Sequence, residues 1–355
     1  MTTHQIRIEP GGRTIECRAD QAILDACLRN SIWIPHACTR GTCGTCKAEL
    51  LSGTVDASDR AATSLTDVEY ASGRVLLCSA TPTSDLVVRS EVPADAGPHL
   101  FPVRDFTGYV AAIEECARET RRIILELDQP IDFVAGQYIT VRVPHSNLRR
   151  SYSLANPPTD RRHLELHVRL TPGGAATDGW LFRNVELGDQ VDVSGPYGSF
   201  LLRSDRPEPA IMIAGGTGLA PIKSMIRHVL ESGGEQRLHL FQGARSRADL
   251  YDGEFFTELA EVYPEQLRYT PCLSDEPWDG TQGLVTDVLG SFYQRARGHV
   301  AYVSGPRGMV EAATRALVSA RMPSKDIYRE AFYDGWESED LVGVPQSGTS
   351  VHEAH

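Results

Sequence analysis

The chain has 355 residues, 41% of them hydrophobic and 23% charged, which is typical of a globular protein with two or three domains. Its formal net charge of −12 disfavours nucleic acid and membranes as partners, since phosphate backbones and anionic lipids are themselves negative. The sequence has neither a secretory signal pattern nor an apolar run near the ~18 residues of a membrane span, so we expect a cytoplasmic protein.

The N-terminal region has the pattern of a small α+β module. Residues 5–9 alternate between polar and apolar side chains, a Pro-Gly-Gly turn follows, and residues 14–18 return as a second strand. A helix is predicted over residues 21–30, with Asp20 as its N-cap, because the apolar residues of this stretch share one helical face. A cysteine-rich loop then follows the helix.

The rest of the chain predicts two further folds. Residues 103–203 contain short alternating strands at regular spacing, which is typical of an antiparallel β-barrel. From residue 204 onward, buried strands alternate with helices, which indicates a doubly wound parallel sheet. Residues 337–355 are acidic and sparsely apolar, and we expect this tail to be disordered.

Four cysteines have a spacing that predicts an iron–sulfur site. Cys38, Cys43 and Cys46 follow the pattern C-x4-C-x2-C, and Cys78 comes after 31 further residues, which is the plant-type 2Fe–2S spacing. Four thiolates hold the two irons of such a cluster, and glycine lets a tight loop fold around it. The alternative is a structural zinc site, but zinc usually takes two C-x2-C pairs and this chain has one.

A glycine-rich turn, "AGGTGLAP", follows the first buried strand of the α/β region. Glycines at Gly216 and Gly218 allow the backbone to approach a pyrophosphate, and the helix that follows offers N–H groups and a favourable dipole. Pro221 fits the first turn of that helix. The spacing differs from the G-x-G-x-x-G fingerprint, so the turn indicates a dinucleotide site of another type.

These motifs together resemble one family. The cysteine set, "RSYSLANPP", "GPYGSF", "AGGTGLAP" and "FQGARSRADLY" resemble the ferredoxin–reductase components of bacterial multicomponent oxygenases, most of all those of phenol, alkane and cyclic-ether monooxygenases. The resemblance covers nearly the whole chain. It implies a multidomain protein with a β-grasp 2Fe–2S ferredoxin domain (1–94), a linker (95–102), a FAD-binding β-barrel (103–203), an NAD-binding α/β domain (204–336) and a disordered tail (337–355).

The resemblance also implies which residues bind FAD. In the R-x-Y-S motif, Tyr152 would stack on the isoalloxazine ring, Ser153 would bond its polar edge and Arg150 would pair with the pyrophosphate. The alternative is a plain barrel strand, and the closing aromatic residues are equally consistent with ordinary core packing. The implied FAD set is Arg150, Tyr152, Ser153, His167, Val168, Arg169, Gly174, Ala176, Thr177, Phe332 and Tyr333, with Glu330 as a further neighbour of the flavin.

A nicotinamide site is implied in the α/β domain. Asp249 can accept from ribose hydroxyls and repel a 2′-phosphate, which favours NADH, whereas Arg245 and Arg247 would attract that phosphate. Family members commonly have a cysteine at the strand end where this chain has Ser304, which puts a thiol's contribution to hydride transfer in doubt. The implied set is Gly216, Thr217, Gly218, Pro221, Gly243, Arg245, Asp249, Ser304, Gly305 and Pro306.

The function implied by the resemblance is an NADH:acceptor oxidoreductase. Electrons would pass from NADH to FAD, then to the 2Fe–2S cluster, and then to the di-iron hydroxylase of a multicomponent monooxygenase. No residue is needed as an acid or base in hydride transfer, because the protein's contribution is positioning. Two alternatives stay open: a Rieske-type ring-hydroxylating dioxygenase as the partner, and a non-enzymatic zinc-binding module with a degenerate nucleotide fold.

Overall fold

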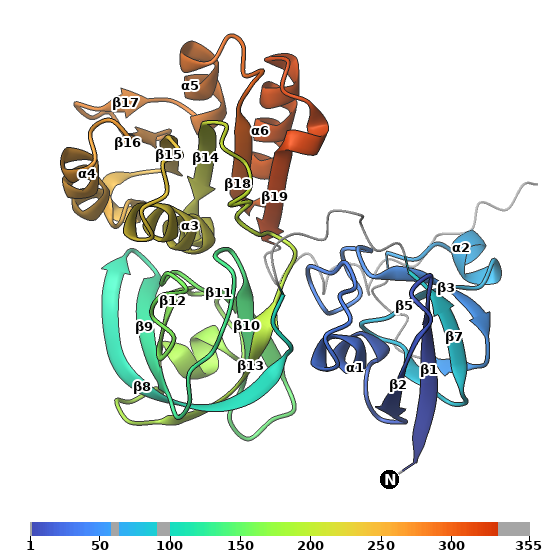
Figure 1. Ribbon diagram of the computed structural model, residues 1–355. Helices are drawn as coiled ribbons and strands as arrows, with labels where there is room; N and C mark the ends of the chain where they lie inside the picture. The colour runs from blue at the N-terminus through green and yellow to red at the C-terminus, as the bar shows by residue number, and fades with distance from the viewer. Residues whose placement is uncertain (1, 58–63, 91–99, 333–355) are drawn as a thin grey trace, which may run out of the picture.

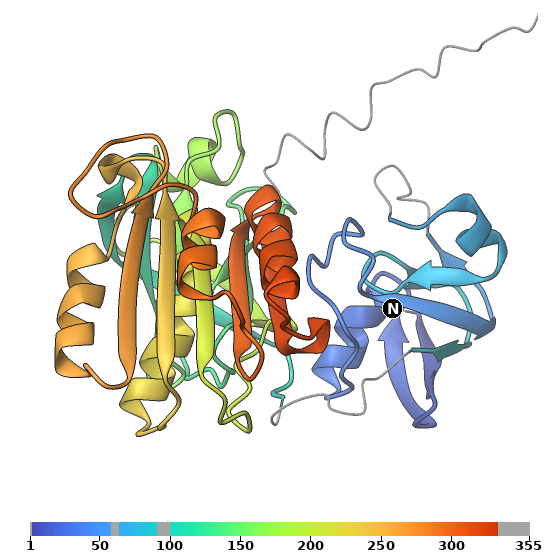
Figure 2. The same cartoon turned by 90° about the horizontal axis from the view of Figure 1, so that it is seen from above.

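Three sheets of five or six strands, each with a different topology, organise the chain, together with a small two-stranded sheet. The computed structural model describes residues 2–57, 64–90 and 100–332, so Tyr333, the predicted tail and most of the predicted linker lie outside the described residues. Figures 1 and 2 show an N-terminal module beside a β-barrel, with an α/β module stacked on the barrel. The predicted multidomain fold class is confirmed.

The N-terminal module is a five-stranded mixed sheet, in the order β2-β1-β7-β3-β5, with helix α1 packed on it. Helix α1 begins at Ile23 with Ala22 as its N-cap, so the prediction of Asp20 as N-cap was wrong. The chain makes a hydrogen-bonded turn from Arg18 to Gln21, and Asp20 pairs with Arg18 at 2.9 Å. The elements are β1 Thr3–Glu9, β2 Arg13–Arg18, α1 Ile23–Arg29, β3 Lys47–Ser52, β4 Val55–Asp56, α2 Asp67–Ala71, β5 Arg74–Leu76, β6 Thr81–Pro82 and β7 Leu86–Arg89.

The second module is a closed antiparallel barrel in the strand order β11-β10-β13-β8-β9-β12. A bridge between Leu154 and Leu166 joins the two outer strands, so no edge is left unpaired there. Apolar side chains of alternating strand residues fill its interior. The elements are β8 Arg104–Ala117, β9 Thr120–Leu127, β10 Tyr138–Arg142, β11 Arg149–Ser153, β12 His163–Arg169, the short helix η1 Thr177–Leu181 and β13 Gln190–Tyr197.

The third module is a parallel sheet, as predicted, and has six strands in the order β17-β16-β15-β14-β18-β19. Helices cover both faces, because alternate residues of β14 pack against α3 and α4 on one side and against α5 and α6 on the other. The elements are β14 Ala210–Gly215, η2 Gly216–Gly218, α3 Leu219–Glu231, β15 Leu238–Ala244, η3 Arg247–Asp249, α4 Gly253–Val262, β16 Leu267–Leu273, β17 Thr281–Gln282, α5 Val285–Phe292, β18 Val300–Pro306, α6 Arg307–Ser319, η4 Ser324–Asp326 and β19 Ile327–Phe332.

No helix in the described part of the chain is long and apolar enough to span a membrane.

A buried histidine holds the N-terminal module against the barrel. The His36 amide donates to Ser199 Oγ at 3.1 Å, Ser199 Oγ donates to the His36 carbonyl at 2.5 Å, and the Gly198 amide donates to His36 Nε2 at 2.8 Å. Burial lowers the pKa of His36 to about 4, so its neutral ring donates from Nδ1 to the Ile34 carbonyl at 2.7 Å. These bonds fix the chain only two residues before the first cysteine of the loop.

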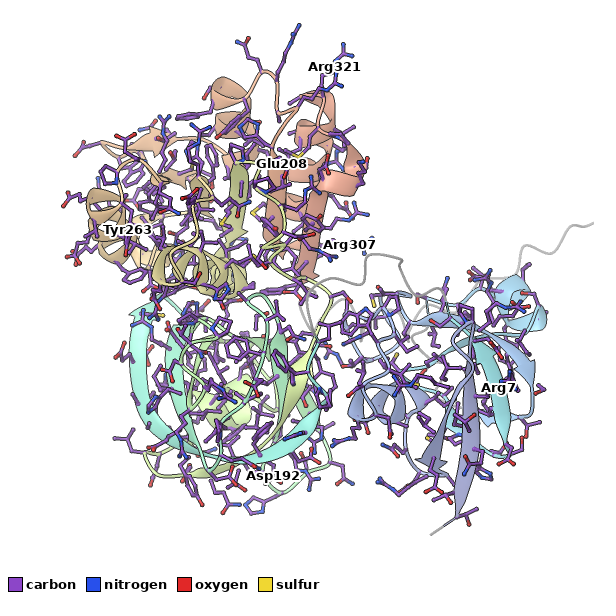
Figure 3. The ribbon with its side chains drawn as sticks, in the orientation of Figure 1. Arg7, Asp192, Glu208, Tyr263, Arg307 and Arg321 are labelled. Carbon is purple, nitrogen blue, oxygen red and sulfur yellow. The ribbon has the colours of Figure 1, made fainter. Side chains whose placement is uncertain are left out.

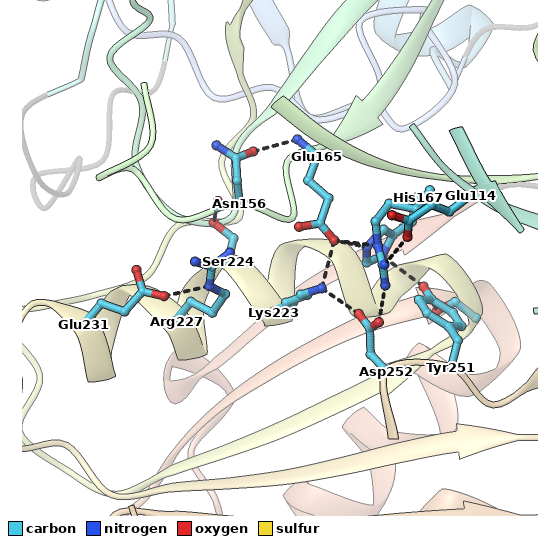
Figure 4. Close-up of polar contacts among 12 residues, drawn as sticks. Glu114, Asn156, Glu165, His167, Lys223, Ser224, Arg227, Glu231, Tyr251 and Asp252 are labelled. Atoms are coloured by element: carbon cyan, nitrogen blue, oxygen red, sulfur yellow. Dashed lines mark hydrogen bonds and ion pairs between the residues drawn. The ribbon is translucent and has the colours of Figure 1, made fainter. Parts of the chain in front are cut away.

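A buried network of charges joins the barrel to the α/β module (Figure 4). The ammonium group of Lys223, on α3, lies 2.8 Å from Glu165 Oε1 on β12 and 2.7 Å from Asp252 Oδ2. Arg122, on β9, pairs with the same two carboxylates. Two cations thus neutralise two anions inside the junction, which sets how the modules meet, since an unpaired buried charge is costly.

Replacing Lys223 with Met is expected to lower the free energy of unfolding by about 3–5 kcal/mol, because it leaves two buried carboxylates with one cation fewer. The matched control is Arg227→Met on the same helix, whose ion pair with Glu231 is 28% and 38% exposed and should cost below about 0.5 kcal/mol. Urea denaturation followed by tryptophan fluorescence measures both. Equal losses in the two variants would show that the network contributes no more than a surface pair.

Candidate functional site

The four cysteines lie together as two pairs of thiols. In the first pair, the Cys38 amide donates to Cys43 Sγ at 3.5 Å and the Cys43 amide donates to Cys38 Sγ at 3.4 Å. In the second, the thiols of Cys46 and Cys78 lie close enough that each shifts the pKa of the other, lowering that of Cys46 and raising that of Cys78. Two irons, each held by one pair of thiolates, would fit this arrangement.

The loop around these thiols favours the anionic form of one thiol in each pair, since the pKa of Cys38 and Cys46 is lowered while the pKa of Cys43 and Cys78 is raised. Donation from the Cys43 thiol, together with amide donation from Arg40 and Cys43, lowers the pKa of Cys38 to about 4. Gly41 and Gly44 have φ values of +84° and +74°, a left-handed conformation that glycine adopts without strain. The backbone thereby curls around the sulfurs and points N–H groups at them, as an iron–sulfur site requires.

The spacing of the sulfurs argues against a single zinc ion. Zinc–sulfur bonds of about 2.3 Å would hold four sulfurs within about 3.8 Å of one another. In the described residues, the only set of three ligand-type residues with donor atoms within 4.8 Å is Glu165, His167 and Asp252, so no three of the cysteines are that close. The carboxylates of that set are bound by Lys223 and Arg122, so they are not free to bind a metal ion.

Strand β11 carries three predicted FAD residues. The Arg150 guanidinium donates to the Arg149 carbonyl at 3.0 Å and has no ion-pair partner among the described residues, so it can still bind an anion. Tyr152 is partly exposed and packs against the barrel core. Ser153 Oγ donates to Glu330 Oε2 at 3.3 Å and so reaches across to the α/β module.

Two predicted FAD residues on β12 direct their side chains elsewhere. His167 is buried, with Nε2 2.9 Å from Glu165 Oε1 and Nδ1 3.0 Å from Tyr251 Oη, and so belongs to the charged network. Val168 is fully buried in the barrel core. Their side chains are therefore engaged within the protein, and any contact with FAD would be through their main chain. Arg169, in contrast, is exposed and lies beside Gly216 at the glycine-rich turn.

The predicted phosphate turn is shaped by its own side chains. Thr177 Oγ1 donates to the Thr171 carbonyl at 3.1 Å and accepts from the Thr171 amide at 3.0 Å. A Cβ at Gly174 would lie 2.9 Å from both of these groups, so only glycine fits. Ala176 is buried in the barrel core. Because these side chains are engaged within the protein, only the main chain of the turn can face a phosphate.

The glycine-rich turn packs against the end of a neighbouring strand. A Cβ at Gly218 would lie 2.3 Å from the Ser304 carbonyl oxygen, and one at Gly305 would lie 2.7 Å from the Gly215 carbonyl oxygen. Thr217 lies within this turn, Pro221 is buried in the first turn of α3, and Pro306 ends β18. The turn therefore lies at the carboxyl edge of the parallel sheet, where α/β proteins bind nucleotides.

Ser304 and Glu330 meet at this edge as register partners on β18 and β19. Ser304 is fully buried, and its Oγ has no hydrogen-bond partner in the described chain, although an unpaired buried hydroxyl costs about 1–3 kcal/mol. Burial raises the pKa of Glu330 to about 8, so its carboxyl group is neutral at neutral pH. Two residues further along the same strands, Phe332 is the register partner of Pro306 and is partly exposed. The unpaired Ser304 hydroxyl is therefore available to a ligand.

The residues predicted for the adenosine end separate into two groups. Asp249 has partners at both oxygens, because it pairs with Arg118 of the barrel at 2.7 Å and accepts from Ser246 Oγ at 2.7 Å. A Cβ at Gly243 would crowd Val285 at 3.1 Å. Arg245 is exposed and has no ion-pair partner among the residues described. Arg247, the other arginine that would attract a 2′-phosphate, pairs with Glu276 at 3.5 Å, and its guanidinium lies over the ring of Trp278.

Sequence reasoning missed the residues that join the modules, including His36, Lys223 and Tyr138. Tyr138 Oη donates to the Ala37 carbonyl at 2.6 Å, across 101 residues of sequence. No local pattern marks such contacts, since the partners are distant in the chain. A hint was available for Lys223, because a lysine among apolar residues of a helix face needs a buried partner.

Each module matches a known domain family. Residues 6–83 match the 2Fe-2S iron-sulfur cluster binding domain, residues 108–201 the oxidoreductase FAD-binding domain, and residues 212–315 the oxidoreductase NAD-binding domain. FAD, NAD and a 2Fe–2S cluster are thus the cofactors of this chain, and the zinc alternative falls away.

Relatives match over nearly the full length. The reductase component of phenol 2-monooxygenase from Pseudomonas sp. (strain CF600) is 42% identical, covering 93% of this chain and 95% of that protein. The aromatic O-demethylase reductase subunit from Amycolatopsis sp. is 44% identical, covering 92% and 98%. The crystal structure of an Amycolatopsis cytochrome P450 reductase superposes with a TM-score of 0.87 at 43% identity, covering 93% and 99%. The chain belongs to the family of reductase components of multicomponent oxygenases, which join a 2Fe–2S ferredoxin domain to FAD and NAD domains.

Proposed function

We propose that this protein takes electrons from NADH and delivers them, through FAD and the 2Fe–2S cluster, to the di-iron hydroxylase of an aromatic-ring monooxygenase. The observation that carries this proposal is the order of the three sites. The carboxyl edge of the α/β sheet meets the FAD strand at the contact between Glu330 and Ser153, and the cysteine loop lies against the same barrel. The phenol 2-monooxygenase reductase, at 42% identity, supports an aromatic substrate for the partner.

The chain's own residues bind and position the cofactors. Arg150 and Arg169, which have no carboxylate partners among the described residues, are suited to the diphosphate of FAD, and Tyr152 to the face of its ring. The glycine-rich turn and Ser304 form the floor of the nicotinamide site. When bound, FAD accepts two electrons as a hydride and the cluster carries them onward singly, so the chain needs no acid or base for C–H cleavage.

NADH is the electron donor that fits the adenosine end. Asp249 places a carboxylate there that repels a 2′-phosphate, although its hydrogen bonds are made with Arg118 and Ser246 rather than left free for a ribose. Arg245 offers an opposing positive charge, and the ratio of kcat/KM for NADH and NADPH measures which effect wins. We infer a cytoplasmic location, because a cluster of free cysteines suits a reducing compartment.

A second candidate partner is a cytochrome P450 that demethylates aromatic ethers, because the aromatic O-demethylase reductase subunit is 44% identical. A Rieske-type dioxygenase is the third, with a naphthalene dioxygenase reductase component at 33% identity. Mixing the purified protein and NADH with one oxygenase of each class, and measuring coupled product per NADH, separates them. Tight coupling with a P450 or a Rieske enzyme but not with a di-iron hydroxylase would overturn the proposal.

Replacing Cys43 with Ser should abolish reduction of the oxygenase partner while sparing reduction of a small dye by NADH, because the dye takes electrons at the flavin. Cys116→Ser, which changes a cysteine of the barrel outside the thiol pairs, is the control and should leave both activities unchanged. Loss of dye reduction in a folded, flavin-loaded Cys43 variant would contradict a linear path from flavin to cluster.

Replacing Arg150 with Ala should weaken FAD binding by on the order of 10- to 100-fold, the scale of one or two charge-assisted hydrogen bonds. Flavin retained after gel filtration at low protein concentration measures the loss. Arg142→Ala is the control, because Arg142 pairs with Asp192, which Figure 3 places at the end of the barrel far from the α/β module. Full flavin retention in the Arg150 variant would reject its assignment.

The rate of flavin reduction by NADH should fall as the pH rises through about 8, the raised pKa of Glu330. Below that pH the carboxyl group is neutral, and above it a negative charge beside the flavin opposes the arrival of electrons. Glu330→Gln stays neutral at every pH, so its rate should lack this fall. Stopped-flow absorbance measures both profiles, and an equal fall in the variant would assign the titration to another group.

A further inference from the structure

Tyr138 lies where the ferredoxin domain meets the FAD barrel. It is 3% exposed, and its hydroxyl donates to the Ala37 carbonyl at 2.6 Å. Ala37 directly precedes Cys38 in the chain, so the tyrosine hydroxyl bonds the backbone immediately before a cluster ligand.

The other side of Tyr138 belongs to the flavin site. On the paired strands β10 and β11, Tyr138 is the register partner of Ser153, so their side chains are neighbours on one face. Ser153 in turn contacts Glu330 at 3.3 Å. Burial raises the pKa of Tyr138 far above its ordinary value, so its hydroxyl keeps the proton that it donates to the Ala37 carbonyl.

The cysteine loop approaches the FAD strand at a second point. Burial raises the pKa of Tyr152, while the positive charges of Arg150 and Arg40 oppose this rise. Arg40 lies in the cysteine loop, and its amide donates to Cys38 Sγ at 3.4 Å. Arg40 of the cysteine loop and Arg150 of β11 thus both act on Tyr152, and the direct hydrogen bond from the barrel to the loop is made by Tyr138 on β10, the strand that pairs with β11.

We propose that Tyr138 is a positioning residue for internal electron transfer, and that its hydroxyl-to-Ala37 hydrogen bond is the shortest bonded route from the flavin site to the cluster. Electron tunnelling weakens steeply with separation and crosses a hydrogen bond more readily than a gap, so this contact sets the transfer rate. Each transfer oxidises the flavin by one electron and reduces the cluster by one. No atom moves through the bridge, and the hydride from NADH supplies the two electrons.

Tyr197 provides a matched comparison at the same interface. Its ring stacks on Tyr138 with centroids 5.6 Å apart, and it is buried to a similar degree. Its hydroxyl, however, contacts Asp25 on α1 at 3.5 Å, away from the cysteine loop. Replacing either tyrosine with phenylalanine keeps the stacked rings. Only Tyr138→Phe removes a hydrogen bond to Ala37, the neighbour of the cluster ligand Cys38.

The experiment compares Tyr138→Phe with Tyr197→Phe in the full-length, flavin- and cluster-loaded protein. Each is mixed anaerobically with one equivalent of NADH, and absorbance is followed separately for the flavin and for the cluster. We expect unchanged NADH-to-flavin transfer in both variants. Flavin-to-cluster transfer should slow on the order of tenfold in Tyr138→Phe alone. This effect is smaller than the ~10²-fold loss of rate that a 1 Å misplacement causes in reactions that form bonds.

Two further readouts separate electronic coupling from loosened docking. Visible circular dichroism of the oxidised cluster, which reports the surroundings of its ligands, should change in Tyr138→Phe and not in Tyr197→Phe. The radius of gyration from small-angle X-ray scattering should match wild type in both. A wild-type transfer rate in Tyr138→Phe, an equal slowing in Tyr197→Phe, or a slowing that comes with domain separation would each overturn the proposal.

Discussion

The placing of the cysteine loop depends most directly on the clamp between His36 and the barrel segment of Gly198 and Ser199. Three hydrogen bonds of 2.5–3.1 Å form around one buried imidazole, which stays neutral because burial lowers its pKa to about 4. This clamp fixes the cysteine loop against the barrel, just after β13. Because electrons move only over short distances, the clamp decides whether the cluster and the flavin can exchange them within one molecule.

The junction between the barrel and the α/β module uses a different kind of contact from the clamp. Lys223, Arg122 and their two carboxylates join the barrel to the α/β module through buried charges, which tolerate little change in spacing. Hydride transfer needs the nicotinamide and the flavin in a single geometry, and a charged lock provides it. The clamp of the ferredoxin domain, in contrast, consists of neutral hydrogen bonds.

Local patterns in the sequence predicted the parts, and long-range contacts decided their arrangement. Alternation predicted the barrel strands, and the spacing of Cys38 and its partners predicted the cluster, because both are properties of neighbouring residues. The N-cap assigned to Asp20 failed because a turn before α1 took that residue into an ion pair with Arg18. The bonds of Tyr138 and Lys223 could not be predicted, since their partners lie 101 and 58 residues away.

Internal electron transfer is the central claim, and its concentration dependence tests it most directly. The loaded protein is reduced with one equivalent of NADH at several protein concentrations, and cluster reduction is followed by rapid freezing and electron paramagnetic resonance. A docked ferredoxin domain predicts a first-order rate constant that is the same at every concentration. A rate constant that rises in proportion to protein concentration would mean that electrons pass between molecules, and would contradict the account.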